Sequence, residues 1–164
     1  MNQLASPVSP GQLALTQLLS ATRRGARLGR LLAVGQLRSW GAPQDLTERA
    51  ELVVAELGSN AVLHGHLPGR SFRLTLVFDA PLGRLRIDVT DARGDEWPPA
   101  PAANAVPDGL LRTGGRGLAL VDALADRWET LPFPPSGKTV RAELIEPAGR
   151  APGHDSATSH PVAR

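Results

Sequence analysis

The sequence predicts an α+β fold, a two-layer α/β sandwich with helices on one face of a mixed, largely antiparallel sheet. Two helical segments precede a pair of alternating strands, and a third, short helix precedes a second pair. Helices with one apolar stripe and hairpins with one apolar face bury both surfaces when they pack as two layers. A chain of 164 residues has the size of one domain.

We expect one ordered domain over residues 12–146, between two disordered ends. Residues 1–11 lack hydrophobic periodicity, and residues 147–164 form a tail rich in Pro, Gly, Ala and Ser that has little to bury. The first ordered segment, residues 12–20, fits a short strand, although its apolar residues also fit a helix.

The next segment, residues 22–40, is a predicted helix with an apolar stripe on one side and arginines on the other. Gly41 and Pro43 end it, because neither residue continues a helix well. The stripe consists of Ala26, Leu28, Leu31, Leu32, Val34 and Leu37.

A second helix is predicted to follow at once. Asp45 and Glu48 form a variant of the capping box that opens it. The helix runs to His64, and Gly65 supplies its C-terminal stop. Its predicted core side is Leu52, Val53, Leu57, Ala61 and Leu63.

The remaining ordered chain is predicted to form two hairpins and a short helix. Residues 79–83 turn the chain between the first two strands. Residues 92–112 hold four prolines and no periodicity, and such a long irregular segment is typical of a functional or a mobile loop. The predicted ranges are 72–78 and 84–90 for the first hairpin, 117–126 for the helix, and 127–131 and 140–144 for the second hairpin.

Composition and charge limit the classes of function. The formal net charge is only +2, and the pI of about 10.3 arises because a chain without Tyr or Cys has almost no group that titrates between His and Arg. Most arginines occur singly, so we expect no direct nucleic-acid binding. No apolar run is long enough to span a membrane, and the absence of Cys excludes thiol chemistry and fits a cytoplasmic location.

Two polar residues of the second helix are the first candidates for chemistry. Glu56 and Asn60 are four residues apart and therefore share one face, one turn above the other, at the edge of the apolar stripe. They form either a solvated Glu–Asn pair or a site in which Glu56 is a general base and Asn60 holds a divalent ion. Gly58 between them indicates close packing on that side.

Asp91 ends the second strand on the same side as its apolar residues, so its carboxylate is expected to point toward the core. It is either a turn-forming residue or an acceptor for a strong donor such as the exocyclic amine of adenine. Residues 113–117, Thr-Gly-Gly-Arg-Gly, lead directly into the third helix. They form either a flexible loop end or a cradle in which backbone N–H groups and the helix N-terminus hold a phosphate.

These features, in this order, resemble the motifs of the GHKL (Bergerat-fold) ATP-binding proteins. The second helix holds Glu-Leu-Gly-Ser-Asn-Ala-Val-Leu-His at residues 56–64, which is similar to the N-box of that superfamily. Asp91-Ala92-Arg93-Gly94 stands where its first glycine box lies, and residues 114–118 resemble its second. Gly137-Lys138-Thr139-Val140 is similar to its last-strand motif, and residues 95–112 would be the ATP lid.

Within that superfamily the chain is most similar to the small bacterial anti-sigma-factor serine kinases. The resemblance implies ATP and Mg²⁺ as cofactors, an anti-anti-sigma (STAS-type) protein and a sigma factor as partners, and a homodimer. It implies Glu56 as the catalytic base and Asn60 as the Mg²⁺ ligand. The implied nucleotide contacts are Asp91 on the adenine amine with Thr139 assisting through water, and Gly94, Gly115, Arg116, Gly117 and Leu118 on the rest of the ATP.

One position departs from the family pattern. Arg93 stands where the first glycine box has its first glycine, which would limit close approach of the backbone to adenine. The departure motivates an alternative function, a non-catalytic nucleotide-binding or degenerate module that regulates transcription by capturing a partner.

Overall fold

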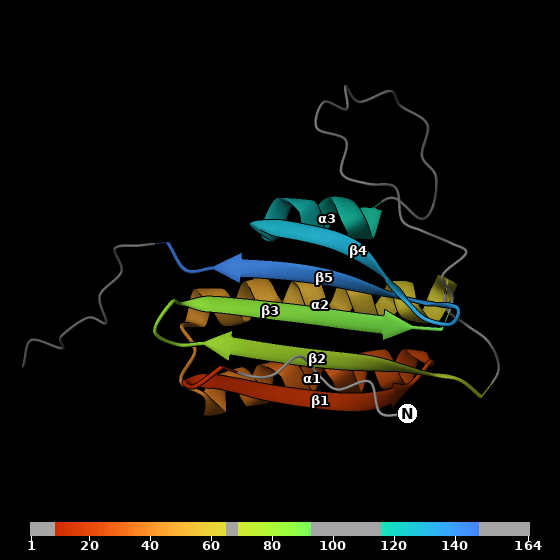
Figure 1. Cartoon of the computed structure of the whole chain (residues 1–164), viewed down its shortest axis with the longest axis horizontal. Coiled ribbons are helices and arrows are strands. Elements are labelled where there is room, and N and C mark those ends of the chain that lie inside the picture. The colour runs from red at the N-terminus through yellow and green to blue at the C-terminus, as the bar shows by residue number, and fades with distance from the viewer. Residues whose placement is uncertain (1–8, 65–68, 93–115, 148–164) are drawn as a thin grey trace, which may run out of the picture.

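The computed structural model describes residues 9–64, 69–92 and 116–147, and the fold is given for these residues (Figure 1). Most of the two predicted disordered ends, the helix stop at Gly65 and the predicted lid over residues 95–112 lie outside the described residues.

The strands form one five-stranded sheet in the order β1-β2-β3-β5-β4. Every neighbouring pair is antiparallel, which corrects the expectation of a mixed sheet. Short turns join β2 to β3 and β4 to β5, and such turns can only join antiparallel neighbours. The strands are β1 (Gln12–Ser20), β2 (Ser71–Asp79), β3 (Arg84–Asp91), β4 (Arg127–Phe133) and β5 (Gly137–Ile145).

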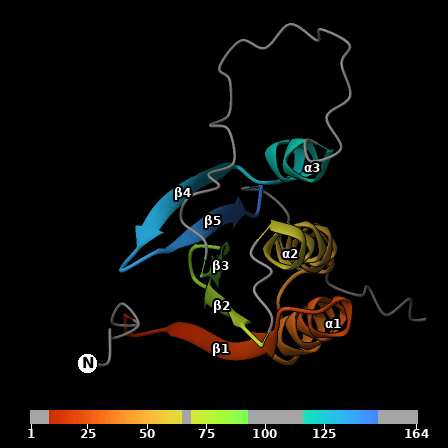
Figure 2. The same cartoon turned by 90° about the vertical axis from the view of Figure 1, so that its right-hand side faces the viewer.

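Three helices, α1 (Arg23–Ser39), α2 (Gln44–His64) and α3 (Arg116–Leu124), cover one face of this sheet (Figure 2). The other face carries no helix of the described chain, so the predicted two-layer α+β fold is confirmed. The core between the layers is aliphatic with two phenylalanines, and Leu57, Leu74, Ile87 and Leu144 are among its fully buried side chains. Among the described residues, no helix is long and apolar enough to cross a membrane.

Residues 12–20, for which strand and helix both fitted the sequence, form strand β1 and pair with β2 over their whole length. As an edge strand, β1 buries only Leu19 fully, and Leu13 and Leu18 remain exposed. The sparse burial explains why its apolar pattern alone could not identify the element.

The core side of α1 differs from the predicted stripe. Leu28, Leu31 and Leu32 are exposed, and small residues replace them in the interior. Helix and sheet approach closely at Gly29, where a Cβ would lie 2.8 Å from the Cδ1 atom of Leu19, and at Gly25 a Cβ would overlap the carbonyl oxygen of Ser20 at the turn from β1 into α1. The buried residues of α1 are Gly25, Ala26, Gly29, Ala33 and Leu37.

The second helix is confirmed, with corrections to its start and its core side. It begins at Gln44, so Asp45 lies in its first turn instead of at the cap position. Leu52 and Leu63, predicted as core, are exposed. The residues that pack inward are Leu46, Ala50, Val53, Val54, Leu57 and Ala61. Gly58 packs against α1 and not on the side of Glu56 and Asn60, and a Cβ there would make an ordinary contact of 3.6 Å with the Cβ of Ala26.

Candidate functional site

Glu56 and Asn60 lie one turn apart on α2, and both are half-buried. Arg49 stands seven residues before Glu56 and therefore shares the same face of the helix. The Arg49 guanidinium contacts the carboxyl end of α3, which shows that this face of α2 is turned toward α3. The pair therefore stands at the boundary between two helices instead of on an open helix surface.

Arg49 holds α2 and α3 together at this boundary, and the sequence analysis gave this residue no role. Its Nε and Nη2 donate to the carbonyl oxygen of Leu124 at 3.1 and 2.7 Å, and Nη1 donates to the carbonyl oxygen of Ile145 at 3.0 Å. Nη2 also lies 2.9 Å from the carboxylate of Asp126. The acceptors are 75 to 96 residues away in sequence, so no local pattern could have revealed them.

The N-terminus of α3 faces the Glu56–Asn60 pair. The two helices run in opposite directions (Figure 1), and Arg49 holds the last residue of α3. Nine residues of helix rise about 13 Å, which places the first turn of α3 about nine residues further along α2, level with Gly58. A helix N-terminus carries unpaired N–H groups and a partial positive charge, so this corner of the molecule favours an anion.

Of the predicted phosphate-binding residues, the structure describes three in this first turn. Arg116 and Gly117 open α3, and Leu118 is partly buried against the core and so anchors the helix. Gly115 and Gly94 lie outside the described residues.

Asp91 ends β3, and its carboxylate points to the core side as predicted, with a relative exposure of 7%. The tip of β3 lies at the same end of the molecule as the start of α3 and the last turns of α2 (Figure 1). The Oδ2 atom of Asp91 is 3.7 Å from the Nζ atom of Lys138, its cross-strand neighbour on β5, which is also buried. Sequence reasoning gave Lys138 no role, although its parity with Val140 indicates an inward side chain.

The side chain of Thr139 does not lie beside that of Asp91, because Thr139 pairs with Thr90 across the two strands. It alternates with Lys138 along β5 and therefore points to the opposite face of the sheet. There its Oγ1 lies 2.7 Å from the Oγ1 of Thr90. At this end of the sheet, the side chain beside Asp91 on the helix side is Lys138 and not Thr139.

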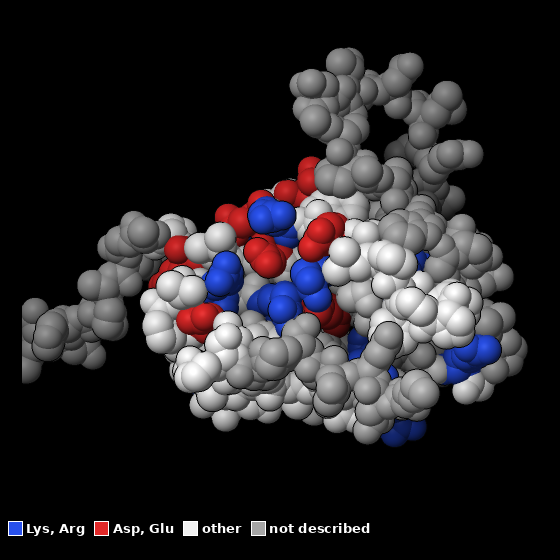
Figure 3. Space-filling view, viewed as in Figure 1, with Lys and Arg blue, Asp and Glu red and all other residues white. Residues whose placement is uncertain are grey.

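The outer face of the sheet carries charges of both signs over β3, β4 and β5 (Figure 3). Arg141 donates to both carboxylate oxygens of Asp88 at 2.9 and 3.0 Å, and Arg86 lies 3.6 Å from the same carboxylate. The hydrogen bond to Asp88 raises the pKa of Arg141 above its ordinary value. These charges pair with one another and do not form a uniformly basic surface.

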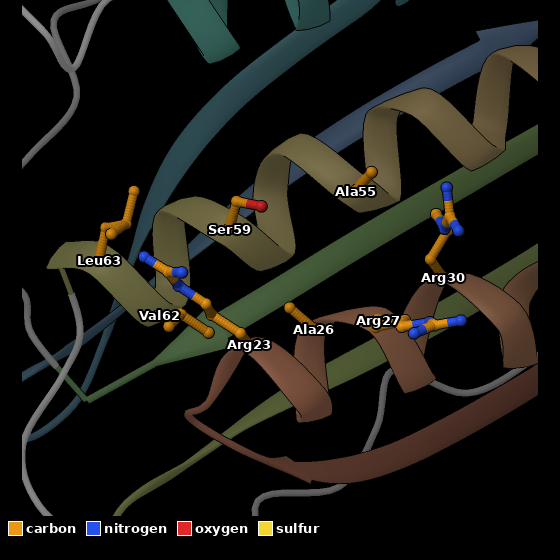
Figure 4. A pocket seen from close by; sticks show the side chains of 8 residues that line it. All are labelled: Arg23, Ala26, Arg27, Arg30, Ala55, Ser59, Val62 and Leu63. Atoms are coloured by element: carbon orange, nitrogen blue, oxygen red, sulfur yellow. The ribbon is translucent and has the colours of Figure 1, made fainter.

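A groove of about 370 Å³ separates α1 from α2 on the helix side (Figure 4). Arg23, Arg27 and Arg30 of α1 line it, at spacings that place them along one side of that helix. The side of the groove formed by α2 is mostly apolar and consists of Ala55, Ser59, Val62 and Leu63, and Ala26 of α1 also lines the groove. The Nη1 atom of Arg30 is 3.5 Å from the Oε1 atom of Glu51.

Comparison with known proteins agrees with this geometry. Residues 19–144 match the family described as the histidine kinase-like ATPase domain. The match covers most of the chain, and the chain belongs to this family of GHKL-type ATPase domains, which implies ATP binding.

Among solved structures, the chain is similar to the crystal structure of the RsbU and RsbW domains of Rv1364c from Mycobacterium tuberculosis, with a TM-score of 0.61 and 22% sequence identity. The alignment covers 83% of this chain and 34% of that one, so this chain spans about a third of the length of that structure. At 22% sequence identity, this similarity shows that the two proteins share a fold and shows nothing further. A search of curated proteins found no match.

Proposed function

We propose that this chain is an ATP-dependent protein serine kinase that acts as an anti-sigma factor. It would phosphorylate a serine of an anti-anti-sigma (STAS-type) partner and sequester a sigma factor. The observation that carries the proposal is the position of Glu56 and Asn60, half-buried on the face of α2 that is turned toward the N-terminus of α3. Placed there, the two side chains could act on an anion held at the start of α3.

The residues present fit a nucleotide and its metal ion. Mg²⁺ is typically bound by one or two protein oxygens together with substrate phosphates and water. Asn60 offers one amide oxygen, and among the described residues no three His, Cys, Asp or Glu side chains gather as a self-sufficient metal site. When bound, Mg²⁺ would neutralise phosphate charge. The first turn of α3, with Gly117 and Leu118, would hold the phosphates through backbone N–H groups.

In the proposed reaction the serine oxygen of the partner forms a bond to the γ-phosphorus, and the bond to the β,γ-bridging oxygen breaks to release ADP. Glu56 accepts the proton of the serine hydroxyl. Phosphoryl transfer depends mostly on positioning and charge neutralisation, so a single base next to a fixed anion site suffices. Asp91 accepts a hydrogen bond from the nucleotide base.

The test is transfer of labelled phosphate from ATP to the purified STAS-type partner in the presence of Mg²⁺. Glu56→Gln keeps the size of the side chain and removes the base, so we expect at least about a hundredfold loss of transfer with nucleotide affinity unchanged. Glu48→Gln, on the exposed side of α2, is the matched control and should transfer at the wild-type rate. Nucleotide binding without any transfer by the wild type would refute the kinase proposal.

A second candidate function is capture of a partner without catalysis, and the groove between α1 and α2 favours it. Three arginines on one wall and mostly apolar residues on the other fit an acidic segment of a partner protein. Arg27→Glu should weaken partner binding in a nucleotide-free pull-down with the purified partner, whereas Arg38→Glu, exposed at the other end of α1, should not. Equal binding by both variants would exclude this groove as the docking surface.

We also propose that the chain forms a homodimer. Strand β1 is an edge of the sheet, contains no charged residue, and exposes Leu18 to 60% of its full area. Uncharged edge strands pair readily with further strands. Leu18→Lys should shift the mass found by sedimentation equilibrium toward the monomer, and an unchanged mass would exclude β1 as the interface.

A further inference from the structure

A second pocket, of about 300 Å³, lies at one end of the sheet, and nothing in the proposed function uses it. It forms where the end of β1, the start of β2, the tip of β3 and the turn between β4 and β5 come together (Figure 1). Leu18, Arg73 and Thr90 line it, and each lies next in sequence to a buried residue that points toward the helices. The pocket therefore opens on the outer face of the sheet, opposite the carboxylate of Asp91, although Asp91 also borders it at the tip of β3.

Two arginines make this pocket positively charged. Arg70 and Arg73 both line it, and among the described residues neither forms an ion pair with an acidic side chain. Elsewhere on the same face the charges are compensated, since Asp88 pairs with both Arg86 and Arg141. The backbone that carries Arg70 is fixed, because its carbonyl oxygen accepts the N–H of Ala21 at 3.0 Å. The pocket thus offers two guanidinium groups to an anion from outside the described chain.

An aromatic ring holds one of these guanidinium groups in place. The Cζ atom of Arg73 lies 5.6 Å from the centroid of the Phe133 ring, which is a cation–π contact. The ring itself lies over Gly137, where a Cβ would be 3.2 Å from the Cδ1 atom of Phe133. Stacking uses the flat face of a guanidinium group and leaves the N–H donors along its edge available. Arg73 is therefore set to donate two parallel hydrogen bonds to one planar acceptor.

The remaining walls are apolar, which limits the kind of anion that fits. Leu18 is 60% exposed, and Pro134 and Pro135 in the turn between β4 and β5 are exposed as well. A phosphate group carries more charge and more bound water than a carboxylate, so apolar walls that remove this water disfavour it more strongly. A carboxylate needs only one bidentate donor, and an apolar body attached to it would cover the exposed leucine and prolines.

We propose that this pocket binds a small organic acid, with one carboxylate on an aromatic or branched aliphatic body. Arg73 donates to both carboxylate oxygens, and Arg70 adds a second positive charge at the rim. The apolar body lies against Leu18 and the turn between β4 and β5. A volume of about 300 Å³ is at the lower end of the range for ligand pockets, which fits a ligand of this size. The proposal does not depend on the proposed kinase activity.

Titration of the isotope-labelled full chain with phenylacetate, followed by NMR without nucleotide, tests the proposal. Phe133 is a suitable reporter, because the other two phenylalanines of the chain are buried in the core. We expect saturable shifts of its ring signals with a Kd of about 5 mM or lower, as for a ligand of this size. Phenylacetamide lacks the charge and acetate lacks the ring, so each should bind at least about tenfold more weakly.

Substitution of the arginines shows whether the shifts come from this pocket. Arg73→Met should weaken phenylacetate at least about tenfold. Arg70→Gln is exposed and leaves the Phe133 stack intact, so a several-fold loss in this variant carries the test if Arg73→Met does not fold. Arg127→Gln, exposed at the start of β4 and outside the pocket, is the control and should bind as the wild type does.

Three results would overturn the proposal. The first is the absence of saturable shifts at Phe133 with phenylacetate. The second is equal binding of phenylacetate and phenylacetamide, which would mean that the arginines do not recognise the carboxylate. The third is equal binding of phenylacetate and acetate, which would reveal an ionic contact without an apolar site. None of these results bears on the proposed kinase, because the titration contains no nucleotide.

Discussion

Arg49 of α2 donates two hydrogen bonds to the carbonyl oxygen of Leu124, the last residue of α3, at 3.1 and 2.7 Å. The carbonyl groups of a final helical turn have no partner within the helix, so the guanidinium caps α3. The same side chain reaches Asp126 and the carbonyl oxygen of Ile145, and Asp126 accepts the N–H of Ile145 at 2.7 Å. One residue thus fixes α3 against α2 and against the end of the sheet.

Arg49→Met should lower the free energy of unfolding by about 2 kcal/mol, because it removes charge-assisted hydrogen bonds to partly buried carbonyl groups. Urea denaturation followed by circular dichroism measures the change. Arg24→Met, exposed on α1, should stay within about 0.5 kcal/mol of wild type. If both variants unfold alike, the Arg49 contacts contribute nothing to stability.

Two glycine-to-alanine changes on the packed helices should have opposite effects. Gly25→Ala places a methyl group onto the carbonyl oxygen of Ser20, a backbone atom that cannot move freely, and should destabilise the fold by about 3 kcal/mol. Gly58→Ala meets Ala26 at an ordinary contact distance of 3.6 Å and gains up to about 1 kcal/mol of helix propensity. Thermal melts of the two variants, shifted in opposite directions from wild type, are the expected result.

Asn60→Ala should abolish the Mg²⁺ dependence of ATP binding, because the proposed protein ligand of the metal is lost. The measurement is the affinity for ATP with and without Mg²⁺, in wild type and variant. Asn60→Asp, which keeps an oxygen at the same position, should restore the dependence. A variant that binds ATP weakly but still responds to Mg²⁺ in full would place the metal elsewhere.

The pair formed by Asp88 and Arg141 should contribute about 1 kcal/mol, as expected for a bidentate pair that is partly open to solvent. A double-mutant cycle of Asp88→Asn and Arg141→Met measures it through urea denaturation. The raised pKa of Arg141 keeps the guanidinium charged up to and beyond the ordinary range of arginine, so the coupling should not change between pH 7 and pH 10. A loss of coupling over this interval would contradict the assignment.

Local periodicity predicted the elements well. Alternation over residues 72–78 and 84–90 predicted both strands of the first hairpin, and the parity of Asp91 with its apolar neighbours placed its carboxylate on the core side. These features depend on residues two to four positions apart, which a sequence shows directly.

The core side of α1 could not be predicted in the same way. Leu28 and Leu31 look like core residues, but the depth of the contact with the sheet selects Gly25 and Gly29 instead. Which residues of α1 are buried depends on how closely the helix approaches the sheet, and the hydrophobic periodicity of the helix does not predict that distance. The partners of Arg49 and the meeting of Lys138 with Asp91 depend on strand order and register, and these arise only in the folded chain.

Lys138 is also the only lysine in the chain, and its side chain is almost wholly enclosed. Amine-directed reagents therefore have a single ε-amino target, and it stands where the base of a nucleotide is proposed to sit. Because that amine is enclosed and lies beside Asp91, its acylation would report opening of this end of the sheet, without a separate reporter group. All other Lys and Arg positions of the chain are arginines, and their guanidinium groups do not react with such reagents.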